Sequence, residues 1–337
     1  MSETPPTLTV LVPCYNESEA LQPLFDRLLP ILDKVGRSFE VVCVNDGSRD
    51  DTLDKLVDWH HRDPRIKVVN LSRNFGKEAA MTAGLHHCAG LAVIPIDADL
   101  QDPPEIIEEM VQQWEEGADV VYATRTTRDT DNWTKRFTAG WFYKLYNALS
   151  DTPIPENTGD FRLMDRRVVE AIMQLPERNR FMKGLFNWVG FRQKQVKIIR
   201  EERSAGETSW NYWKLWNFAL DGITASTTLP LRIAFYIGIG VSAIAALITL
   251  FLIGRGLIQE ADTPGYASTM VAILFLGGLQ LTFLGVIGEY MGRMYQEIKQ
   301  RPVFLIDQTW GTINPVQGRP LPKHQKPDTA QSAEPAE

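Results

Sequence analysis

The sequence predicts an α/β protein with a mostly parallel sheet, followed by two long apolar helices. In the first 125 residues, five short apolar or β-branched runs alternate with helical patterns, and two charge-free stretches follow position 232. Repeated β-α-β units imply a parallel sheet with helices on both faces. A chain of 337 residues exceeds one ordinary domain, so we expect two parts.

The individual elements follow from the period of the apolar residues. The predicted strands are Leu8–Val12, Phe39–Asn45, Ile66–Leu71, Leu91–Ile96 and Asp119–Ala123. The predicted helices are Leu21–Val35, Thr52–His61, Lys77–Cys88 and Glu105–Glu116. Ser48 followed by Asp51 predicts a capping box for the second helix. Ligands of such sheets bind beyond the carboxyl ends of the strands, so functional residues are expected just after each strand.

Composition limits the function classes and the compartment. A net charge of -7 and a pI near 5.4 argue against wholesale nucleic-acid binding. Cys14, Cys43 and Cys88 are unclustered and lie in or beside apolar runs, so they predict neither a disulfide framework nor a zinc site. The segment Met1–Thr7 has no basic stretch and no long apolar run, so it does not resemble a secretory signal. We expect residues 1–230 to stay in the reducing cytoplasm.

Two stretches without charge predict a membrane hairpin. Ile233–Ile253 has 21 uncharged residues, a length of about 32 Å as a helix, which matches a bilayer core. Ala267–Gly288 is the second such stretch, and Gly254–Tyr266 forms a short loop between them. Buried core helices of a soluble protein are the alternative, but runs of this length favour membrane spans.

The basic residues orient the predicted hairpin. They precede the first span and follow the second: Lys214, Arg232, Arg293, Lys299 and Arg301. The loop offers only Arg255, so the positive-inside rule places both chain ends in the cytoplasm of a two-span inner (plasma) membrane protein. From Gly311 the chain is rich in Pro, Gln, Lys and Glu, which predicts a disordered tail.

Polar clusters follow three of the predicted strands. They are Pro13–Glu17 after the first, Asp46–Ser48 after the second and Asp97–Gln101 after the fourth. The chain contains neither GxGxxG nor GxxxxGK[ST], so a bound nucleotide phosphate would not be held by a glycine loop. The charge of such a phosphate would have to be offset by another group, such as a divalent cation.

The cluster after the fourth strand supplies candidate metal ligands. Carboxylate and amide oxygens suit Mg²⁺ or Mn²⁺. On an extended strand end, Asp97 and Asp99 would point the same way, and Gln101 would continue that side. Two aspartates at a strand end are also typical of turns, and Asp102-Pro103-Pro104 has turn chemistry.

Several of these segments recur together in one known family. The segments are Val10–Glu17 (VLVPCYNE), Val44–Thr52 (VNDGSRDDT), Asn74–Lys77 (NFGK), Asp97–Pro103 (DADLQDP), Gly159–Arg162 (GDFR) and Ala205–Trp210 (AGETSW). Together with the two spans they resemble the family-2 inverting glycosyltransferases of the GT-A fold. Within that family the pattern is similar to the polyprenyl-phosphate glycosyltransferases, which include dolichol-phosphate mannose synthases and bactoprenol glucosyltransferases. The resemblance covers residues 7 to about 305.

The resemblance implies a domain organisation. Residues 1–209 would form the GT-A catalytic domain and 210–230 interfacial amphipathic helices. Residues 231–292 would form the transmembrane hairpin, 293–310 a cytoplasmic juxtamembrane segment and 311–337 the disordered tail. The aromatic segment Trp210–Leu229 is the basis for the interfacial helix, and the alternative is a helix that packs on the catalytic domain.

The resemblance also implies a donor site for a nucleotide sugar. Asp46 would contact the base or ribose, with a pocket wall formed by Pro13, Tyr15 and Glu17. Asp97 would lie near the ribose or diphosphate as a catalytic residue, while Asp99 and Gln101 would ligate Mg²⁺ or Mn²⁺. Trp210-Asn211 stands where the family often has Lys-Tyr, so a lysine contact to the donor phosphate is in doubt. Lys77 or Arg203 would substitute for it.

A lipid-phosphate acceptor follows from the predicted hairpin, because such a phosphate must be met at the headgroup plane by cationic side chains. The candidates are Arg125, Arg128, Lys135, Arg136, Arg200 and Arg203. Arg125, directly after the fifth strand, is preferred, with help from Lys135 or Arg136. Asp160, in a predicted loop Thr158–Asp160 after the helical stretch Trp133–Leu149, would position or deprotonate the acceptor. The alternative is that Asp160 pairs with Arg162.

The run AGETSWNYWKLWNFALDGI most resembles the bactoprenol glucosyltransferases. This resemblance implies inverting transfer from UDP-glucose to undecaprenyl phosphate, and we expect a homo-oligomer without nucleic-acid partners. A phosphate monoester is largely dianionic near pH 7, so it needs little help from a base. GDP-mannose or another UDP-sugar as donor stays open, and so does a non-enzymatic partner of a lipid-sugar flippase. A processive polysaccharide synthase would require the QxxRW motif, which is absent, and a nucleotidyltransferase would require a glycine-rich loop after the first strand.

Overall fold

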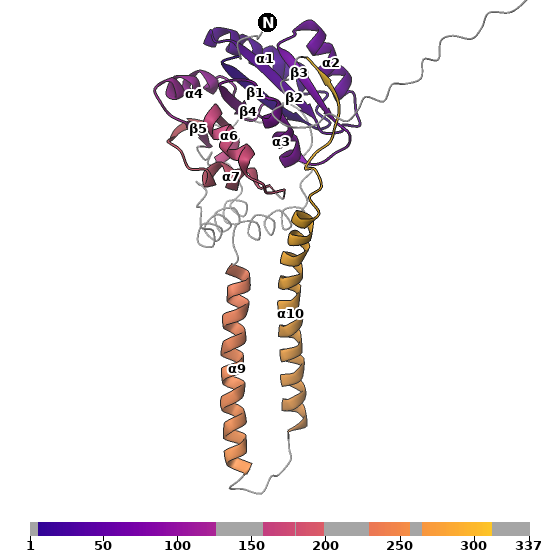
Figure 1. The fold of residues 1–337 in the computed structure, drawn as a ribbon, viewed down its shortest axis with the longest axis vertical. Coiled ribbons are helices and arrows are strands. Elements are labelled where there is room, and N and C mark those ends of the chain that lie inside the picture. Colours follow the sequence, from indigo (N-terminus) through magenta and orange to yellow (C-terminus); the bar gives the residue numbers. More distant parts are fainter. Residues whose placement is uncertain (1–5, 126–157, 179, 199–228, 257–264, 312–337) are drawn as a thin grey trace, which may run out of the picture. The chain divides into compact units, whose positions relative to one another are not determined.

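The computed structural model describes residues 6–125, 158–178, 180–198, 229–256 and 265–311 (Figure 1). The chain divides into two compact units. The first unit contains Met1–Leu100 together with Val303–Glu337, and the second is Gln101–Pro302. Residues from the far end of the chain therefore belong to the same unit as its beginning.

The sheet of the first unit has five strands in the order β4-β1-β2-β3-β8. These are β1 (Leu8–Cys14), β2 (Phe39–Asn45), β3 (Ile66–Leu71), β4 (Ala92–Pro95) and β8 (Ile306–Trp310). The first four are parallel, and β8 pairs antiparallel with β3. The predicted parallel sheet is confirmed here, whereas β8 was not predicted. Every residue of β2 is buried, as in strands covered on both faces.

Three helices cover this sheet: α1 (Leu21–Val35), α2 (Thr52–Arg62) and α3 (Lys77–His87). The buried face of α1 has helical spacing, with Leu21, Leu24, Phe25 and Leu28 in the core. The predicted capping box of α2 is wrong. The Ser48 hydroxyl accepts a hydrogen bond from another loop, and Asp50 Oδ1 accepts from both the amide and the hydroxyl of Thr52, at 3.2 Å and 2.6 Å.

The strand order locates the ligand edge. From β1 the chain moves through β2 to β3, then reverses and returns through α3 to β4 on the other side of β1. Right-handed crossovers place α3 on the face opposite α1 and α2. The point at which the strand order reverses lies between β1 and β4, and ligands of open α/β sheets bind beyond the carboxyl ends at such a point.

The second unit begins with a smaller α/β arrangement. Its elements are α4 (Ile106–Glu115), β5 (Val120–Arg125), β6 (Thr158–Asp165), α6 (Arg166–Gln174), α7 (Met182–Trp188) and β7 (Gln193–Ile198). β5 pairs antiparallel with β6 and parallel with β7. The predicted loop Thr158–Asp160 is wrong, because Thr158 pairs with Thr124 of β5 and begins β6. The four elements after β5 were not predicted.

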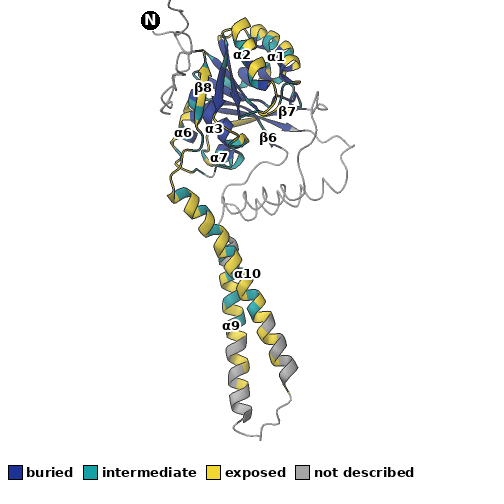
Figure 2. Ribbon diagram, turned by 90° about the vertical axis from the view of Figure 1, so that its right-hand side faces the viewer, coloured by how far each residue is buried: buried dark blue, intermediate teal, exposed yellow. Residues whose placement is uncertain are grey.

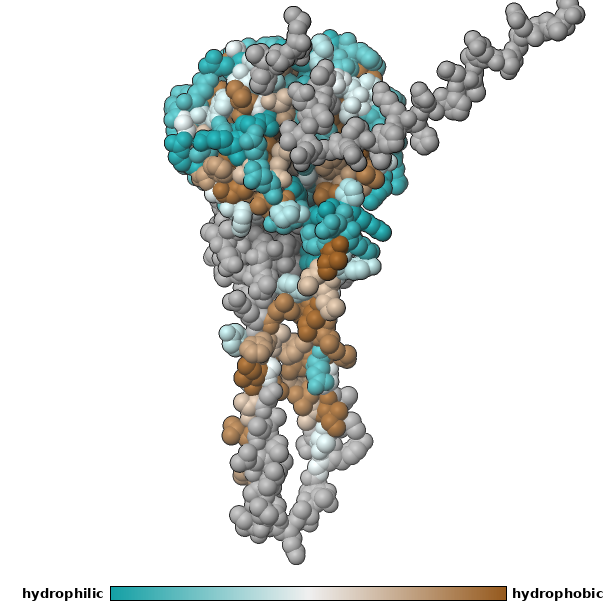
Figure 3. Space-filling model, viewed as in Figure 1, coloured by the Kyte–Doolittle hydropathy of each residue, from teal (hydrophilic) through white to brown (hydrophobic). Residues whose placement is uncertain are grey.

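Two long helices, α9 (Leu229–Gly256) and α10 (Tyr266–Ile298), complete the second unit. They lie side by side and carry exposed apolar side chains, drawn in brown in Figure 3 and in yellow in Figure 2. Phe235, Leu247 and Leu281 are 63%, 70% and 71% exposed. The structure leaves many side chains of both helices undescribed, and among the residues that it describes no helix qualifies as a membrane span.

Candidate functional site

The loops after β1 and β2 are held together by backbone-to-side-chain hydrogen bonds. The Asn16 amide donates to Ser48 Oγ at 3.0 Å, and the Arg49 amide donates to Asn16 Oδ1 at 2.8 Å. Asn16 has a φ of 56°, a left-handed conformation that asparagine tolerates. The Glu17 amide donates to Thr52 Oγ1 at 2.9 Å. Of the residues predicted to form the pocket wall, Tyr15 is exposed and Pro13 and Glu17 are half-buried, and their role as a wall stays a prediction.

Asp46, just after β2, is buried and holds the loop that precedes α3. Its Oδ1 accepts from the Phe75 amide at 2.7 Å and its Oδ2 from the Gly76 amide at 2.9 Å. Burial raises the pKa of Asp46, and these two amides oppose that shift. Gly47 has a φ of 63°, and a Cβ there would come within 2.5 Å of the Arg73 backbone, so glycine is required. The predicted nucleotide contact of Asp46 stays a prediction, and its role in holding this loop was missed.

The same loop leads into α3, whose first residue, Lys77, forms an ion pair with Asp97. Gly76, with a φ of 99°, precedes the first residue of α3. Lys77 Nζ lies 2.6 Å from Asp97 Oδ1 and 2.9 Å from Oδ2. Both side chains are partly exposed, at 44% and 38%. Sequence reasoning assigned each residue separately to the donor, and the structure brings them together as one ion pair at the ligand edge.

The loops after β1 and β4 converge around Cys14. A hydrogen bond with Cys43 and burial raise the pKa of the Cys14 thiol, and the charges of Glu17 and Asp97 add to that shift. Glu17 follows β1 and Asp97 follows β4, so both carboxylates lie close enough to Cys14 to interact with it. Glu17 and Asp97 therefore lie beyond neighbouring parallel strands, where functional residues were expected, and their binding roles stay predictions.

The metal-ligand segment is a turn and not an extended strand end. β4 ends at Pro95, a turn includes Ala98 and Asp99, and Leu100 has a φ of 56°. The predicted extension from Asp97 through Gln101 is therefore wrong. A left-handed leucine costs on the order of 1 kcal/mol, and such strain gathers at functional sites.

The predicted metal ligands carry oxygen donors of the kind that a hard cation accepts. Asp99 is 9% exposed and the amide oxygen of Gln101 is buried, and carboxylate and amide oxygens are ligands that Mg²⁺ and Mn²⁺ accept. Within the described ranges, no group of three or more His, Cys, Asp or Glu side chains is placed to hold a metal ion. The predicted ligands Asp99 and Gln101 supply one carboxylate and one amide, and their metal-binding role stays a prediction.

In the second unit, Asp160 lies near a buried cation. Arg162 is 3% exposed, its guanidinium lies 4.1 Å from the ring centre of Phe186, and it donates to the Gly159 carbonyl at 2.9 Å. Burial lowers the pKa of Arg162 to about 10, while the charge of Asp160 opposes that shift. Asp160 therefore favours the charged form of Arg162, and its predicted role toward the acceptor stays a prediction.

The predicted acceptor contacts are only partly covered by the structure. Arg125 ends β5, opposite Ile198 of β7. Several other candidate segments and residues lie outside the described residues: Arg128, Lys135, Arg136, Arg200, Arg203, residues 133–149, residues 205–228 and most of the loop between α9 and α10.

Comparison with known proteins identifies the family. Residues 9–173 match the model of glycosyl transferase family 2, and residues 229–294 match the GtrB C-terminal hairpin. The chain is 48% identical over 299 residues to the SfII prophage-derived bactoprenol glucosyl transferase of Shigella flexneri, a match that covers 89% of this chain and 97% of that protein. The chain belongs to glycosyl transferase family 2.

Two other relatives match this chain over nearly the same length. A prophage bactoprenol glucosyl transferase homologue of Escherichia coli K12 is 47% identical, covering 89% of this chain and 98% of that protein. An uncharacterised glycosyltransferase of Synechocystis is 56% identical, covering 90% of this chain and 96% of that protein. The catalytic sheet and the hairpin therefore recur in one continuous match.

Proposed function

We propose that this chain transfers a hexose from a nucleotide sugar, preferably UDP-glucose, to a polyprenyl phosphate, preferably undecaprenyl phosphate. One observation carries the proposal: nearly the whole chain, catalytic domain and hairpin together, is 48% identical to a protein named bactoprenol glucosyl transferase. The ion pair of Lys77 and Asp97 at the ligand edge supports a site for a charged donor.

The residues at the edge suggest how the donor is held. Lys77 is partly exposed, so its ammonium can turn from Asp97 toward a diphosphate oxygen. The hydrogen bond to the diphosphate would replace the one to Asp97, and both are charge-assisted. Asp99 and Gln101 would hold Mg²⁺ or Mn²⁺. When bound, such a cation offsets the negative charge of the departing nucleoside diphosphate.

The acceptor phosphate is its own nucleophile. One of its oxygens attacks the anomeric carbon of the hexose, and the bond to the nucleoside diphosphate breaks on the opposite side. This direct displacement inverts the configuration, so an α-linked donor yields a β-linked lipid phosphate sugar. The phosphate is already largely dianionic near neutral pH, so Asp160 would position the acceptor and not need to remove a proton.

Release of nucleoside diphosphate tests the proposed function. The purified chain in lipid nanodiscs is incubated with UDP-glucose, GDP-mannose or another UDP-sugar, each with and without undecaprenyl phosphate. We expect UDP release that requires both UDP-glucose and the lipid phosphate. If only GDP-mannose supports release, the donor is GDP-mannose and not UDP-glucose. If no donor supports release, the proposed enzymatic activity is refuted, and a non-enzymatic membrane partner is favoured.

We further propose that α9 and α10 form a two-span hairpin in the inner membrane, with the catalytic domain in the cytoplasm. The charge-free runs within both helices and their exposed apolar side chains support this. Basic residues precede the charge-free run of α9 and follow that of α10, which supports a cytoplasmic location for both of these ends.

Cysteine labelling tests this topology. Cys14, Cys43 and Cys88 are buried, so a membrane-impermeant thiol reagent should report mainly on an introduced cysteine. We expect Thr263→Cys, in the hairpin loop, to be labelled from the outside of intact cells. Asp58→Cys, on the exposed side of α2, is the matched control and should be labelled only after lysis. Labelling of Thr263→Cys only from the cytoplasmic side would refute the topology.

A further inference from the structure

Strand β8 joins the first unit through a bulge centred on Asp307. In the pairing with β3, Asn70 lies opposite Gln308 and Leu71 lies opposite Ile306, so Asp307 is the extra residue. Bulges are common beside active sites, where they redirect a side chain. Here the redirected side chain is Asp307, whose Oδ2 accepts a hydrogen bond from Asn70 Nδ2 at 3.2 Å.

Asn70 also forms a hydrogen bond with Asn45, the last residue of β2. Its Oδ1 accepts from Asn45 Nδ2 at 2.8 Å, and Asn45 Oδ1 lies 3.4 Å from the Ser48 amide. Asn45 and Asn70 are buried, at 2% and 8% exposure. A buried amide without its partner is costly, so each member of this chain of bonds restrains the next. Asn45 directly precedes Asp46, the residue that holds the loop before α3.

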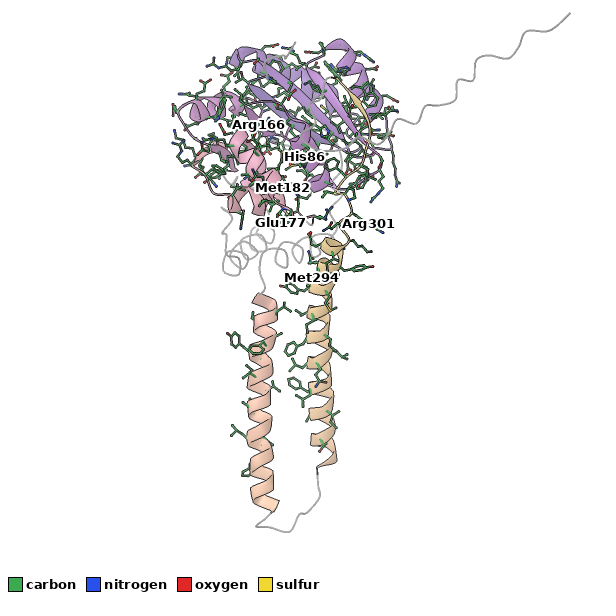
Figure 4. All side chains as sticks on the ribbon, in the orientation of Figure 1. His86, Arg166, Glu177, Met182, Met294 and Arg301 are labelled. Atoms are coloured by element: carbon green, nitrogen blue, oxygen red, sulfur yellow. The ribbon has the colours of Figure 1, made fainter. Side chains whose placement is uncertain are left out.

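The segment before β8 contacts the same loop at its beginning. The Ser72 amide donates to the Leu305 carbonyl at 2.9 Å. The ring of Phe304 lies 5.9 Å from that of His86 and 6.5 Å from that of His87, both in the last turn of α3. Figure 4 labels His86 at this position. The loop from Ser72 to Gly76 is therefore held by residues 304–307 at its start and by Asp46 at its end.

We propose that Asp307 is a positioning residue for the donor site, which acts through Asn70 on the loop that carries Lys77 to Asp97. The inference rests on the proposed role of Lys77 in donor binding. The proposal also gives a function to the segment that follows α10. Residues 299–305 connect that helix to β8, the strand that contains Asp307.

Steady-state kinetics of four variants test this role. Asp307→Ala should raise the KM for the donor roughly three- to tenfold, the effect of one lost hydrogen bond, with the KM for the lipid phosphate unchanged. Asp307→Asn should resemble the parent, because its amide oxygen accepts the same bond. Asn70→Asp should weaken donor binding, because two carboxylates then face each other. Combining Asn70→Asp with Asp307→Asn should restore it, because the bond re-forms with donor and acceptor exchanged.

Hydrogen exchange gives a readout that does not depend on activity. Without any nucleotide, Asp307→Ala should speed exchange of the Phe75 and Gly76 amides, which Asp46 binds. Gln308→Ala, the neighbouring exposed residue of β8, is the matched control and should change neither exchange nor kinetics. If no nucleotide sugar supports turnover in the parent chain, the proposed function fails while exchange still tests the role of Asp307.

Two outcomes would overturn the positioning role. One is unchanged exchange in Asp307→Ala. The other is a rise in both KM values with a lower melting temperature, which would mean that Asp307 only stabilises the fold. Rescue of donor KM and of amide protection by the exchanged pair would support the proposal, because a general loss of stability at an edge strand would not be reversed by exchanging two side chains.

Discussion

Asp99→Asn is expected to lower turnover by about three orders of magnitude. A metal ligand supports several kcal/mol of transition-state charge stabilisation, and each 1.36 kcal/mol is a tenfold change in rate. The amide has nearly the shape of the carboxylate but no charge, so the variant should bind metal weakly. Turnover with Mg²⁺ and Mn²⁺ over a range of concentrations measures the effect, and a chelator should abolish activity of the parent chain.

The Asp99→Asn variant should also remain folded. Asp99 is 9% exposed and lies in the turn after β4, outside the strands of the sheet. The equal size of the two side chains is the reason to expect a melting temperature close to that of the parent. Asp58→Asn, an exposed residue on α2, is the matched control and should leave activity intact. Full turnover in chelator, or an unaffected Asp99→Asn enzyme, would contradict the metal site.

Arg125→Ala should raise the apparent KM for the lipid phosphate, or lower turnover, roughly ten- to 150-fold. Removing one charge-assisted contact costs on the order of 1.5 to 3 kcal/mol. Arg125 is the last residue of β5, whose carboxyl end lies beside that of the parallel strand β7. Donor affinity should stay nearly unchanged, which separates the acceptor contact from the nucleotide contacts. Initial rates at varied acceptor concentration, with calorimetry of nucleotide-sugar binding, measure the two effects.

Arg37→Ala is the control for Arg125→Ala, and loss of donor binding is the result that would contradict the prediction. Arg37, exposed between α1 and β2, lies at the amino end of a parallel strand, so Arg37→Ala should leave both KM values unchanged. If calorimetry shows that Arg125→Ala loses nucleotide-sugar binding while acceptor kinetics stay intact, Arg125 belongs to the donor diphosphate. Arg200 or Arg203 would then be the better candidates for the acceptor.

The candidate site was predictable wherever it depends on strand ends. Asp46 and Asp97 follow β2 and β4, and in parallel strands the carboxyl ends lie at one edge. What these side chains bind was not predictable. The contact of Asp46 with the Phe75 and Gly76 amides depends on the direction of loop amides, and the turn at Asp99 depends on a left-handed Leu100. Neither backbone feature leaves a period in the sequence.

The sequence by itself determined the parts of the fold that have a local period. The strands and helices up to residue 125 each carry their own pattern of apolar side chains over consecutive residues, and the two long helices are marked by charge-free runs. Both signals exist before any tertiary contact, because they depend only on the order of apolar and polar residues along one element.

Only the tertiary structure decided how distant segments pair. β8 has five residues with mixed polarity, and no period marks it as a strand. It is stabilised by backbone hydrogen bonds to β3, and the bond from Asn70 to Asp307 spans 237 positions. Backbone groups are the same in every residue, so the choice of partner strand depends on which edge is open in the folded sheet. A pairing of this kind has no signal in the residues that form it.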